Sequence, residues 1–225
     1  MEQFMNIAKD LEKTVTCDLD RIQELAPNCS EYIDNIRINL GGQISAMTAL
    51  IEEKHRINEI NLNGSNKFHL VGPEHCQNVL VFLLAGVRRP NTTLATAKYA
   101  VVWGPAHQLN ITRQNPLPAK NRTNTSLLAL LACLHQASVL KFRRITIMVN
   151  SPKVKSLIEN LPLLHVQNFL NDNGLPVQHH EILTLILKIL RDEKIRVEFM
   201  LPVPNPPLDA IYYSLQAAAR ILVDM

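Results

Sequence analysis

The sequence predicts an α/β fold, with a mixed five-stranded sheet flanked by helices, preceded by an N-terminal helical hairpin. Apolar residues recur at helical spacing over residues 1–60, whereas later apolar runs are short and alternate with helical patterns. The later elements follow the order β-β-β-α-β-α-α-β-α, which is typical of a layered α/β domain. With 225 residues, 47% of them hydrophobic, the chain suits one domain with an appendage or two small domains. We therefore expect a coiled-coil-like hairpin (1–60), a linker (61–70) and a globular domain (71–225).

Two helices are predicted on either side of Pro27, which ends the first helix. Asn28 with Glu31 three residues later is a capping-box pattern for the second helix. Gly41-Gly42 is a weak point inside it, because glycine lowers helix stability. The seam residues that recur on one face of each helix are Phe4, Leu11, Val15, Ile22, Ile33, Leu40 and Met47. These seams predict assembly as a homodimer or with a partner helix, but a hairpin that packs only on its own domain fits equally well.

The globular domain opens with three predicted strands and a long helix. Val79–Leu84 is almost wholly apolar and is expected at the centre of the sheet, and Lys98–Trp103 and a short strand near Leu109–Thr112 follow. The next segment, Thr125–Val139, is apolar around most of its circumference, which predicts a buried central helix.

The remaining elements are predicted from the spacing of their apolar residues and from the turn-forming residues between them. In order, we expect strand Arg144–Val149, helix Pro152–Asn160, an irregular segment Leu161–Val177, helix Glu181–Arg191, strand Ile195–Leu201 and helix Leu208–Leu222.

One block carries a family resemblance. The stretch Tyr99-Ala-Val-Val-Trp-Gly-Pro-Ala-His-Gln-Leu-Asn110, followed by Leu117-Pro-Ala-Lys-Asn-Arg-Thr-Asn124, resembles the middle of the eukaryotic type 1 ribonuclease H catalytic domain. The resemblance runs from about Val79 to the C-terminus and implies a ribonuclease H-like fold. Members of that family cut the RNA strand of RNA–DNA hybrids with four carboxylates around two magnesium ions.

None of those four carboxylates is found at the matching positions, which are Leu84, Leu128, Asn150 and Ser214. If the alignment of the first strand is shifted by one residue, the family's first Asp and the Gly after it match Ala85 and Gly86, and there is again no carboxylate. Two Mg²⁺ ions need several anionic oxygens, and these side chains offer two neutral ones at best. We therefore expect a catalytically degenerate protein without nuclease activity, bound metal or cofactor. Either the old cleft has collapsed into the core, or it receives an apolar group from a partner.

Only some of the residues that bind nucleic acid in that family have counterparts in this chain. Arg122, Thr123 and Asn124 match the family's loop that touches the RNA backbone. The family's basic, tryptophan-rich segment is poorly kept, because no Lys or Arg occurs between Glu159 and Lys188. We expect a second basic surface beside the old site, formed by Arg143, Arg144, Lys153 and Lys155.

Charge and the remaining motifs narrow the classes of function. Residues 1–70 hold 7 Lys or Arg against 11 Asp or Glu, whereas residues 71–225 hold 16 against 9, which makes the second part mildly basic. His179-His180-Glu181 does not form a chelating pair on one helix, because adjacent residues diverge by about 100°. The four cysteines, Cys17, Cys29, Cys76 and Cys133, are scattered, which argues against a zinc cluster.

No apolar run reaches the length of about 20 residues that spans a bilayer, and the N-terminus lacks a signal pattern. We therefore expect no membrane association and an intracellular location, nuclear rather than cytoplasmic. The most consistent hypothesis is a protein-interaction scaffold or adaptor, in a nucleic-acid-related complex. The alternative is a non-cleaving binder of RNA–DNA hybrid or RNA.

Overall fold

The computed structural model describes residues 2–60, 68–72, 77–88, 95–117, 121–149, 151–171, 173–200 and 216. The side chains of residues 1–9, 11 and 12 are not among those described. The predicted helix Leu208–Leu222 therefore lies outside the described residues, apart from Gln216, which is helical. By its internal contacts the chain divides into two units, which are Met1–Arg56 with Pro116–Ala119, and Ile57–Asn115 with Lys120–Met225.

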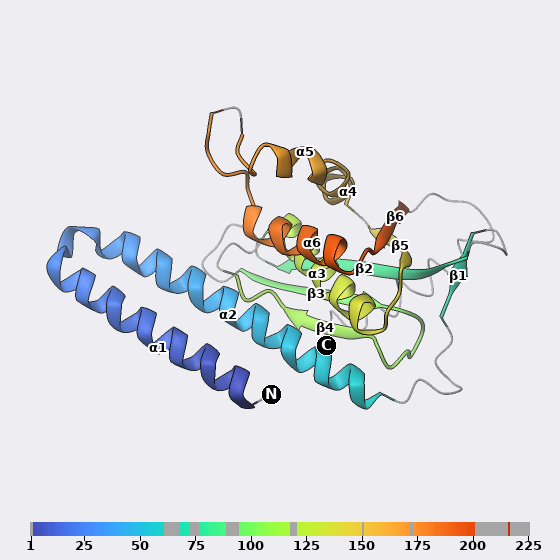
Figure 1. Cartoon of the computed structure of the whole chain (residues 1–225), viewed down its shortest axis with the longest axis horizontal. Helices are drawn as coiled ribbons and strands as arrows, with labels where there is room; N and C mark the ends of the chain where they lie inside the picture. The colour runs from blue at the N-terminus through green and yellow to red at the C-terminus, as the bar shows by residue number, and fades with distance from the viewer. Residues whose placement is uncertain are drawn as a thin grey trace. The chain divides into compact units, whose positions relative to one another are not determined.

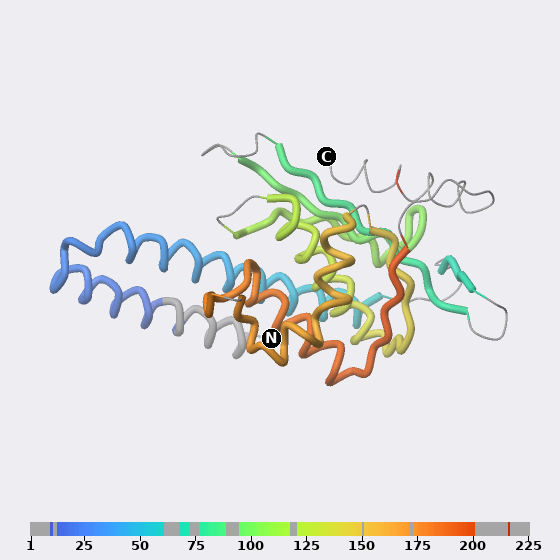
Figure 2. Tube along the Cα trace, turned by 90° about the horizontal axis from the view of Figure 1, so that it is seen from above, coloured from blue at the N-terminus to red at the C-terminus, as the bar shows by residue number. Residues whose placement is uncertain are grey.

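The first unit is a helical hairpin. Helix α1 (Glu2–Leu25) and helix α2 (Ser30–Glu59) are joined by a short 3₁₀ turn, η1 (Pro27–Cys29). The two helices run antiparallel, side by side, in both views of the chain (Figures 1 and 2). Because the 3₁₀ turn occupies residues 27–29, α2 begins at Ser30, two residues beyond the expected capping residue Asn28.

Polar contacts close the hairpin near its turn. The Gln23 side-chain amide donates to the Ser30 hydroxyl at 2.8 Å. The Arg37 guanidinium on α2 forms an ion pair with Asp20 on α1 and a second one with Asp34 at 3.3 Å. The Arg37–Asp20 pair joins α2 to α1, whereas Arg37–Asp34 lies within α2. Ion pairs this close to solvent each contribute about 1 kcal/mol or less.

The second unit is built on a mixed sheet. Its strands are β1 (Leu70–Val71), β2 (Asn78–Arg88), β3 (Thr96–Val102), β4 (Ile111–Gln114), β5 (Arg144–Val149) and β6 (Arg196–Met200). Five of them follow the order β4-β3-β2-β5-β6, and β1 adds a short antiparallel pair to the start of β2.

Strand β2 is the centre of this sheet. It is antiparallel to β3, from Phe82 opposite Val102 to Arg88 opposite Thr96. On its other side it is parallel to β5, from Val79 beside Ile145 to Leu83 beside Val149. Residues 78–83 are buried on both faces, as expected for a central strand between two layers.

Four helices belong to this unit within the described residues: α3 (Arg122–Val139), α4 (Pro152–Glu159), α5 (Leu161–Val166) and α6 (His180–Asp192). Helix α3 packs on β2 and β3 and contacts α6 on its other side. Thirteen of its residues are buried, from Asn124 to Ala137, which confirms the prediction of a central buried helix. Among the described helices, none is long and apolar enough to cross a membrane.

Two local predictions were wrong. The segment expected to be irregular contains α5, because Pro162 occupies the first turn of that helix, where proline costs no hydrogen bond. Strand β4 begins at Ile111 rather than near Leu109. The Asn110 side chain explains this shift, because it accepts from the Trp103 N–H at 2.8 Å and donates to the Gly104 carbonyl at 2.7 Å, which holds the preceding residues in a turn.

Candidate functional site

Leu84, the first position matched to a catalytic acid, lies on the central strand β2. It is opposite Ala100 on β3, and its side chain packs against a buried apolar cluster. That cluster consists of Leu80, Phe82, Ala100, Val102 and Met148. The alternative matches, Ala85 and Gly86, continue the same strand opposite Tyr99 and Lys98. Leu84 is therefore partly buried on apolar neighbours and offers no metal ligand.

Leu128, the second position matched to a catalytic acid, lies inside α3. Its side chain is 4% exposed, and its neighbours Leu127 and Ala129 are fully buried. Leu128 is thus part of the core, whereas Leu84 keeps partial exposure. A leucine with this burial contributes roughly 2–5 kcal/mol to stability, as judged from leucine-to-alanine changes in protein cores.

The other two positions, Asn150 and Ser214, lie outside the described residues. Strand β5 ends at Val149, beside Leu83 on β2. Within the described part of the chain, no group of three or more His, Cys, Asp or Glu side chains is placed to hold a metal ion.

The loop expected to touch an RNA backbone is turned partly inward. Asn124 is 1% exposed, and its side-chain carbonyl accepts from the Asn115 amide at 2.9 Å. The same Asn115 amide donates to the Thr125 hydroxyl at 2.9 Å, and Asn121 caps α3 by accepting from the Asn124 N–H. The prediction that Asn124 contacts nucleic acid is therefore wrong, because its side chain is used to fix the start of α3. Arg122 is exposed and Thr123 partly so.

The four cations expected to form one basic surface lie at opposite ends of β5. Arg143 and Arg144 stand at the start of the strand, whereas Lys153 and Lys155 follow its end, in α4. Because β5 has six residues, its ends are separated by roughly 17 Å. The prediction of a single basic surface was therefore wrong. Only the two lysines lie at the end of β5 near the old site.

The two separated pairs have different neighbours. The Arg143 guanidinium donates to the Glu193 carbonyl, and Arg144 lies beside Arg196 in the parallel register of β5 and β6. Lys155 pairs with Glu159 at 3.7 Å on the surface of α4.

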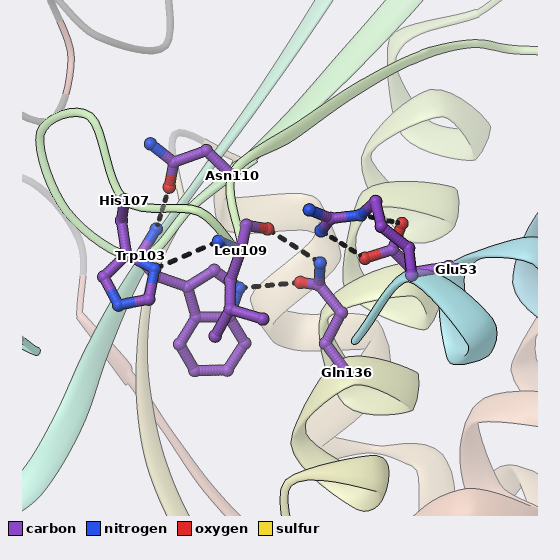
Figure 3. A network of polar contacts seen from close by, with 7 residues as sticks. Glu53, Trp103, His107, Leu109, Asn110 and Gln136 are labelled. Carbon is purple, nitrogen blue, oxygen red and sulfur yellow. Dashed lines mark hydrogen bonds and ion pairs between the residues drawn. The ribbon is translucent and has the colours of Figure 1, made fainter. Parts of the chain in front are cut away.

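The Trp-Gly-Pro block that carried the family resemblance is an internal hydrogen-bond network (Figure 3). The Trp103 indole N–H donates to the Gln136 side-chain carbonyl at 2.7 Å, and the Gln136 amide donates to the Leu109 carbonyl at 2.8 Å. The Leu109 N–H in turn donates to His107 Nδ1 at 3.1 Å. Trp103 and Gln136 are both fully buried. The block therefore joins the end of β3 to α3 and is used for structure.

An aromatic cluster surrounds this network. The Phe68 ring lies 5.9 Å from Trp103, 4.7 Å from His107 and 5.2 Å from Phe142, measured between ring centroids. Edge-to-face pairs of this kind add about 0.5–1.5 kcal/mol each to the burial of the rings. Trp103 is thus covered by other rings and presents no face on which a nucleic-acid base stacks.

The histidine pair stands at the start of α6. His179 adopts a left-handed backbone, with a φ of 68°, and His180 is the first residue of α6. Desolvation by burial and the nearby positive charge of Lys153 lower the pKa of His179 below its ordinary value of 6.5, against the opposing effect of Glu181. Lowering the pKa favours the neutral imidazole.

The described cysteines are free thiols. Cys17 and Cys29 are exposed, and Cys133 is buried in α3. Burial raises the pKa of the Cys133 thiol far above its ordinary value of 9.0, so it stays protonated and is unsuited to act as a nucleophile.

The seam of the hairpin is only partly on the surface. Ile22 is 50% exposed and Met47 is 57% exposed, whereas Ile33 is only 2% exposed. Val15 and Leu40 are half-buried, and the side chains of Phe4 and Leu11 are outside the described residues. The assignment of Ile33 to a partner-facing seam was therefore wrong, because this side chain is already buried.

Sequence reasoning missed a pocket between α5 and α6. Its polar lining includes His165, Lys188 and Arg191. These residues were overlooked because α5 was expected to be irregular, so that nothing indicated which of its side chains would face α6.

Comparisons with known proteins give the fold. No family model and no curated protein matches the chain. A foamy viral protease-reverse transcriptase solved in complex with dsDNA aligns with 64% of this chain and 92% of its own, at a TM-score of 0.50 and 13% identity. A second structure, solved with an RNA/DNA hybrid, aligns with 73% of this chain and 22% of its own, at a TM-score of 0.51 and 14% identity. The solution structure of the PFV RNase H domain aligns at a TM-score of 0.48 and 13% identity, over 64% of this chain and 93% of its own.

At these identities the likeness concerns the fold alone. The mixed sheet, its flanking helices and the N-terminal helical segment together give this chain a ribonuclease H-like fold.

Proposed function

We propose that this protein is a catalytically degenerate ribonuclease H-like protein that works through protein interactions, as a scaffold or adaptor in a nucleic-acid-related complex. The observation that carries the proposal is the burial of Leu128 inside α3, together with the packing of Leu84 on the apolar cluster. Two-metal hydrolysis needs carboxylates that hold both ions and stabilise the attacking and leaving oxygens. Apolar side chains at these positions supply neither function.

The hairpin supports the interaction part of the proposal. Besides Ile22 and Met47, its exposed apolar side chains are Leu25, Tyr32 and Ile38, which are 83%, 70% and 55% exposed. Exposed apolar side chains on two long helices are typical of a surface that binds a second helix. We infer that the hairpin forms a homodimer or binds a partner helix.

A non-cleaving binder of RNA–DNA hybrid or RNA is the second candidate. It is favoured by Arg144 and Arg196, which are both exposed and adjacent on β5 and β6. Neighbouring cations on a sheet surface are suited to a phosphate backbone. The absence of carboxylates at positions 84 and 128 also removes repulsion toward phosphate.

The first prediction concerns nuclease activity. The full chain, incubated with an end-labelled RNA–DNA hybrid in Mg²⁺ and separately in Mn²⁺, is expected to leave the RNA strand intact, because no carboxylate stands at the four matching positions. The matched variants are Asp209→Asn and Asp172→Asn, of which Asp209 is the acid nearest in sequence to Ser214. Metal-dependent cleavage that either variant abolishes would overturn the proposal.

The same preparation separates the two candidates. We expect only weak hybrid binding near physiological salt in a fluorescence titration, with little selectivity over duplex DNA. A submicromolar, salt-dependent affinity that is selective for the hybrid favours the second candidate instead.

A further inference from the structure

The pocket between α5 and α6 has the properties of a binding site. It is an open depression of about 440 Å³, and this volume is within the usual range for ligand pockets. Its lining includes His165, Asn168, Phe169, Leu187, Lys188 and Arg191. Helices α5 and α6 contact each other directly, so the pocket lies within one unit of the chain.

One wall of the pocket carries positive charge in a fixed position. The Arg191 guanidinium lies 3.1 Å from His165 Nε2, an interaction that holds the arginine against α5. Lys188 is one helical turn before Arg191 on α6, so the two cations share a face. Among the described residues no carboxylate pairs with Lys188, and the only acid in the lining is Asp192. The pocket therefore has a net positive charge and two donors that favour an anionic group.

The floor of the pocket is apolar and rigidly held. Phe169 is 8% exposed, and both Asn168 and Phe169 have a left-handed backbone, with φ values of 53° and 56°. The turn is kept by two hydrogen bonds, from the Phe169 N–H to the Leu164 carbonyl at 2.7 Å and from the Val177 N–H to the Phe169 carbonyl at 2.8 Å. A bulky residue in this conformation is strained, and such strain persists where the surrounding structure fixes it, often at binding sites.

Exposed aliphatic side chains lie on the same elements as the pocket. Leu163 and Val166 on α5 are 58% and 78% exposed, and Leu170 after α5 and Leu185 on α6 are 38% and 39% exposed. This combination of two cations with aliphatic surface differs from a nucleic-acid surface, which needs a longer track of cations and open aromatic faces. It is complementary to a peptide that carries both acidic and large apolar side chains.

We propose that the α5–α6 pocket binds a short acidic peptide segment of a protein partner. An apolar side chain of that segment lies on Phe169 and Leu187, and a neighbouring carboxylate is bound by Lys188 and Arg191. This inference goes beyond the proposed assembly through the hairpin, because it concerns a different surface and a partner of stated chemistry.

The test uses the full chain and a fluorescein-labelled ten-residue peptide that alternates Asp or Glu with Leu and Phe. Fluorescence anisotropy is expected to show saturable binding, and amide shifts in the NMR spectrum are expected at residues that line the pocket. Lys188→Gln and Arg191→Gln should each weaken binding about tenfold, because each removes one charge-assisted contact. A peptide with Asn and Gln in place of its acids should bind weakly to the unchanged protein.

Matched controls distinguish the pocket from general attraction to positive charge. Lys194→Gln and Lys141→Gln remove exposed cations of the same unit that lie outside the pocket, and they should leave peptide affinity unchanged. Equal losses in all four variants, or no binding of the acidic peptide, would overturn the proposal. So would tighter binding at the pocket of a ten-nucleotide single strand. None of these outcomes depends on the hybrid-cleavage assay, so the two proposals fail separately.

Discussion

At the scale of single residues, His179 links pH to stability. It has a left-handed backbone before α6, and its pKa is lowered by burial and by Lys153. When the pH falls through the ordinary value of 6.5, the unfolded chain takes up the proton before the folded chain does. Protonation therefore favours unfolding. The contribution of His179 to stability is fully present above that pH and is lost as the pH falls through its lowered pKa.

We predict that His179→Asn makes the free energy of unfolding depend less on pH in this range. Asparagine tolerates a left-handed backbone and has no proton to gain, so the variant should lose less stability than the unchanged protein between pH 7.5 and pH 5. Urea unfolding at several pH values measures the effect, and His180→Asn, the same change one residue later, is the matched control. Parallel curves for the unchanged protein and His179→Asn would contradict the prediction.

Residues of the Trp-Gly-Pro block show what a sequence pattern reveals and what it conceals. The block was recognised from Tyr99–Asn110 and Leu117–Asn124, with Trp103-Gly-Pro as its most specific part, and it indicated the ribonuclease H-like fold. Its role was not predictable, because the hydrogen-bond partner of the Trp103 indole is Gln136, in a helix 33 residues later. Only the packing of α3 on β3 brings the two side chains together. For the same reason the inward turn of Asn124 was missed.

At the scale of elements, the two glycines of α2 are in different surroundings. A β-carbon at Gly41 would have no atom within 4 Å, whereas one at Gly42 would lie 3.0 Å from the Pro116 carbonyl and 3.3 Å from Leu117 Cα. Both of these neighbours are backbone atoms of a segment that belongs to the hairpin unit by its contacts. Gly42 is therefore needed for a close approach of two backbones, and Gly41 is not.

We predict opposite results for the two alanine variants. Gly41→Ala should raise the free energy of unfolding by about 0.5–1 kcal/mol, because alanine stabilises a helix interior. Gly42→Ala should instead have a lower free energy of unfolding than the unchanged protein, because its methyl group displaces the Pro116–Leu117 backbone. Denaturant unfolding of the two variants side by side checks this. An equal gain in both would show that the close approach at Gly42 is not required.

Apolar patterns predicted strand β5 and helix α3 better than helix α5. Strand β5 has the predicted bounds, and α3 was predicted to within three residues, because the apolar runs over these segments are unambiguous. Helix α5 has six residues and contains a proline, so its pattern was too short to distinguish it from a loop. The α5–α6 pocket could not be predicted for that reason.

At the scale of the whole molecule, the order of strands separates charges that are close in the sequence. Arg144 and Lys153 are nine positions apart, but β5 places them at its two ends. The sequence predicted the mixed sheet and its flanking helices. It did not predict which cations share a surface, because that depends on strand direction and register.

Assembly through the hairpin is also a property of the whole molecule. We predict that the full chain self-associates or binds a partner helix, and that Ile22→Asp with Met47→Asp weakens self-association at least about tenfold. Both side chains are at least half exposed, so the charges should not unfold the hairpin but would be costly in an apolar interface. Analytical ultracentrifugation across a range of concentrations is the measurement.

Ser45→Asp is the matched control for that experiment. Ser45 is an exposed polar residue of α2 that is not a seam residue, so its change should leave association intact. A chain that stays monomeric at high concentration, and fails to bind a helical partner, would rule out assembly through the seam.

Under the proposed function, the burial of Leu128 also limits how an acid could be introduced at this position. A glutamate there would occupy a site that is 4% exposed, where an unpaired charge costs several kcal/mol. A domain with a typical total stability of about 5–15 kcal/mol tolerates few such changes. Leu128→Glu alone should therefore destabilise the domain without completing a metal site, because position 84 still carries a leucine.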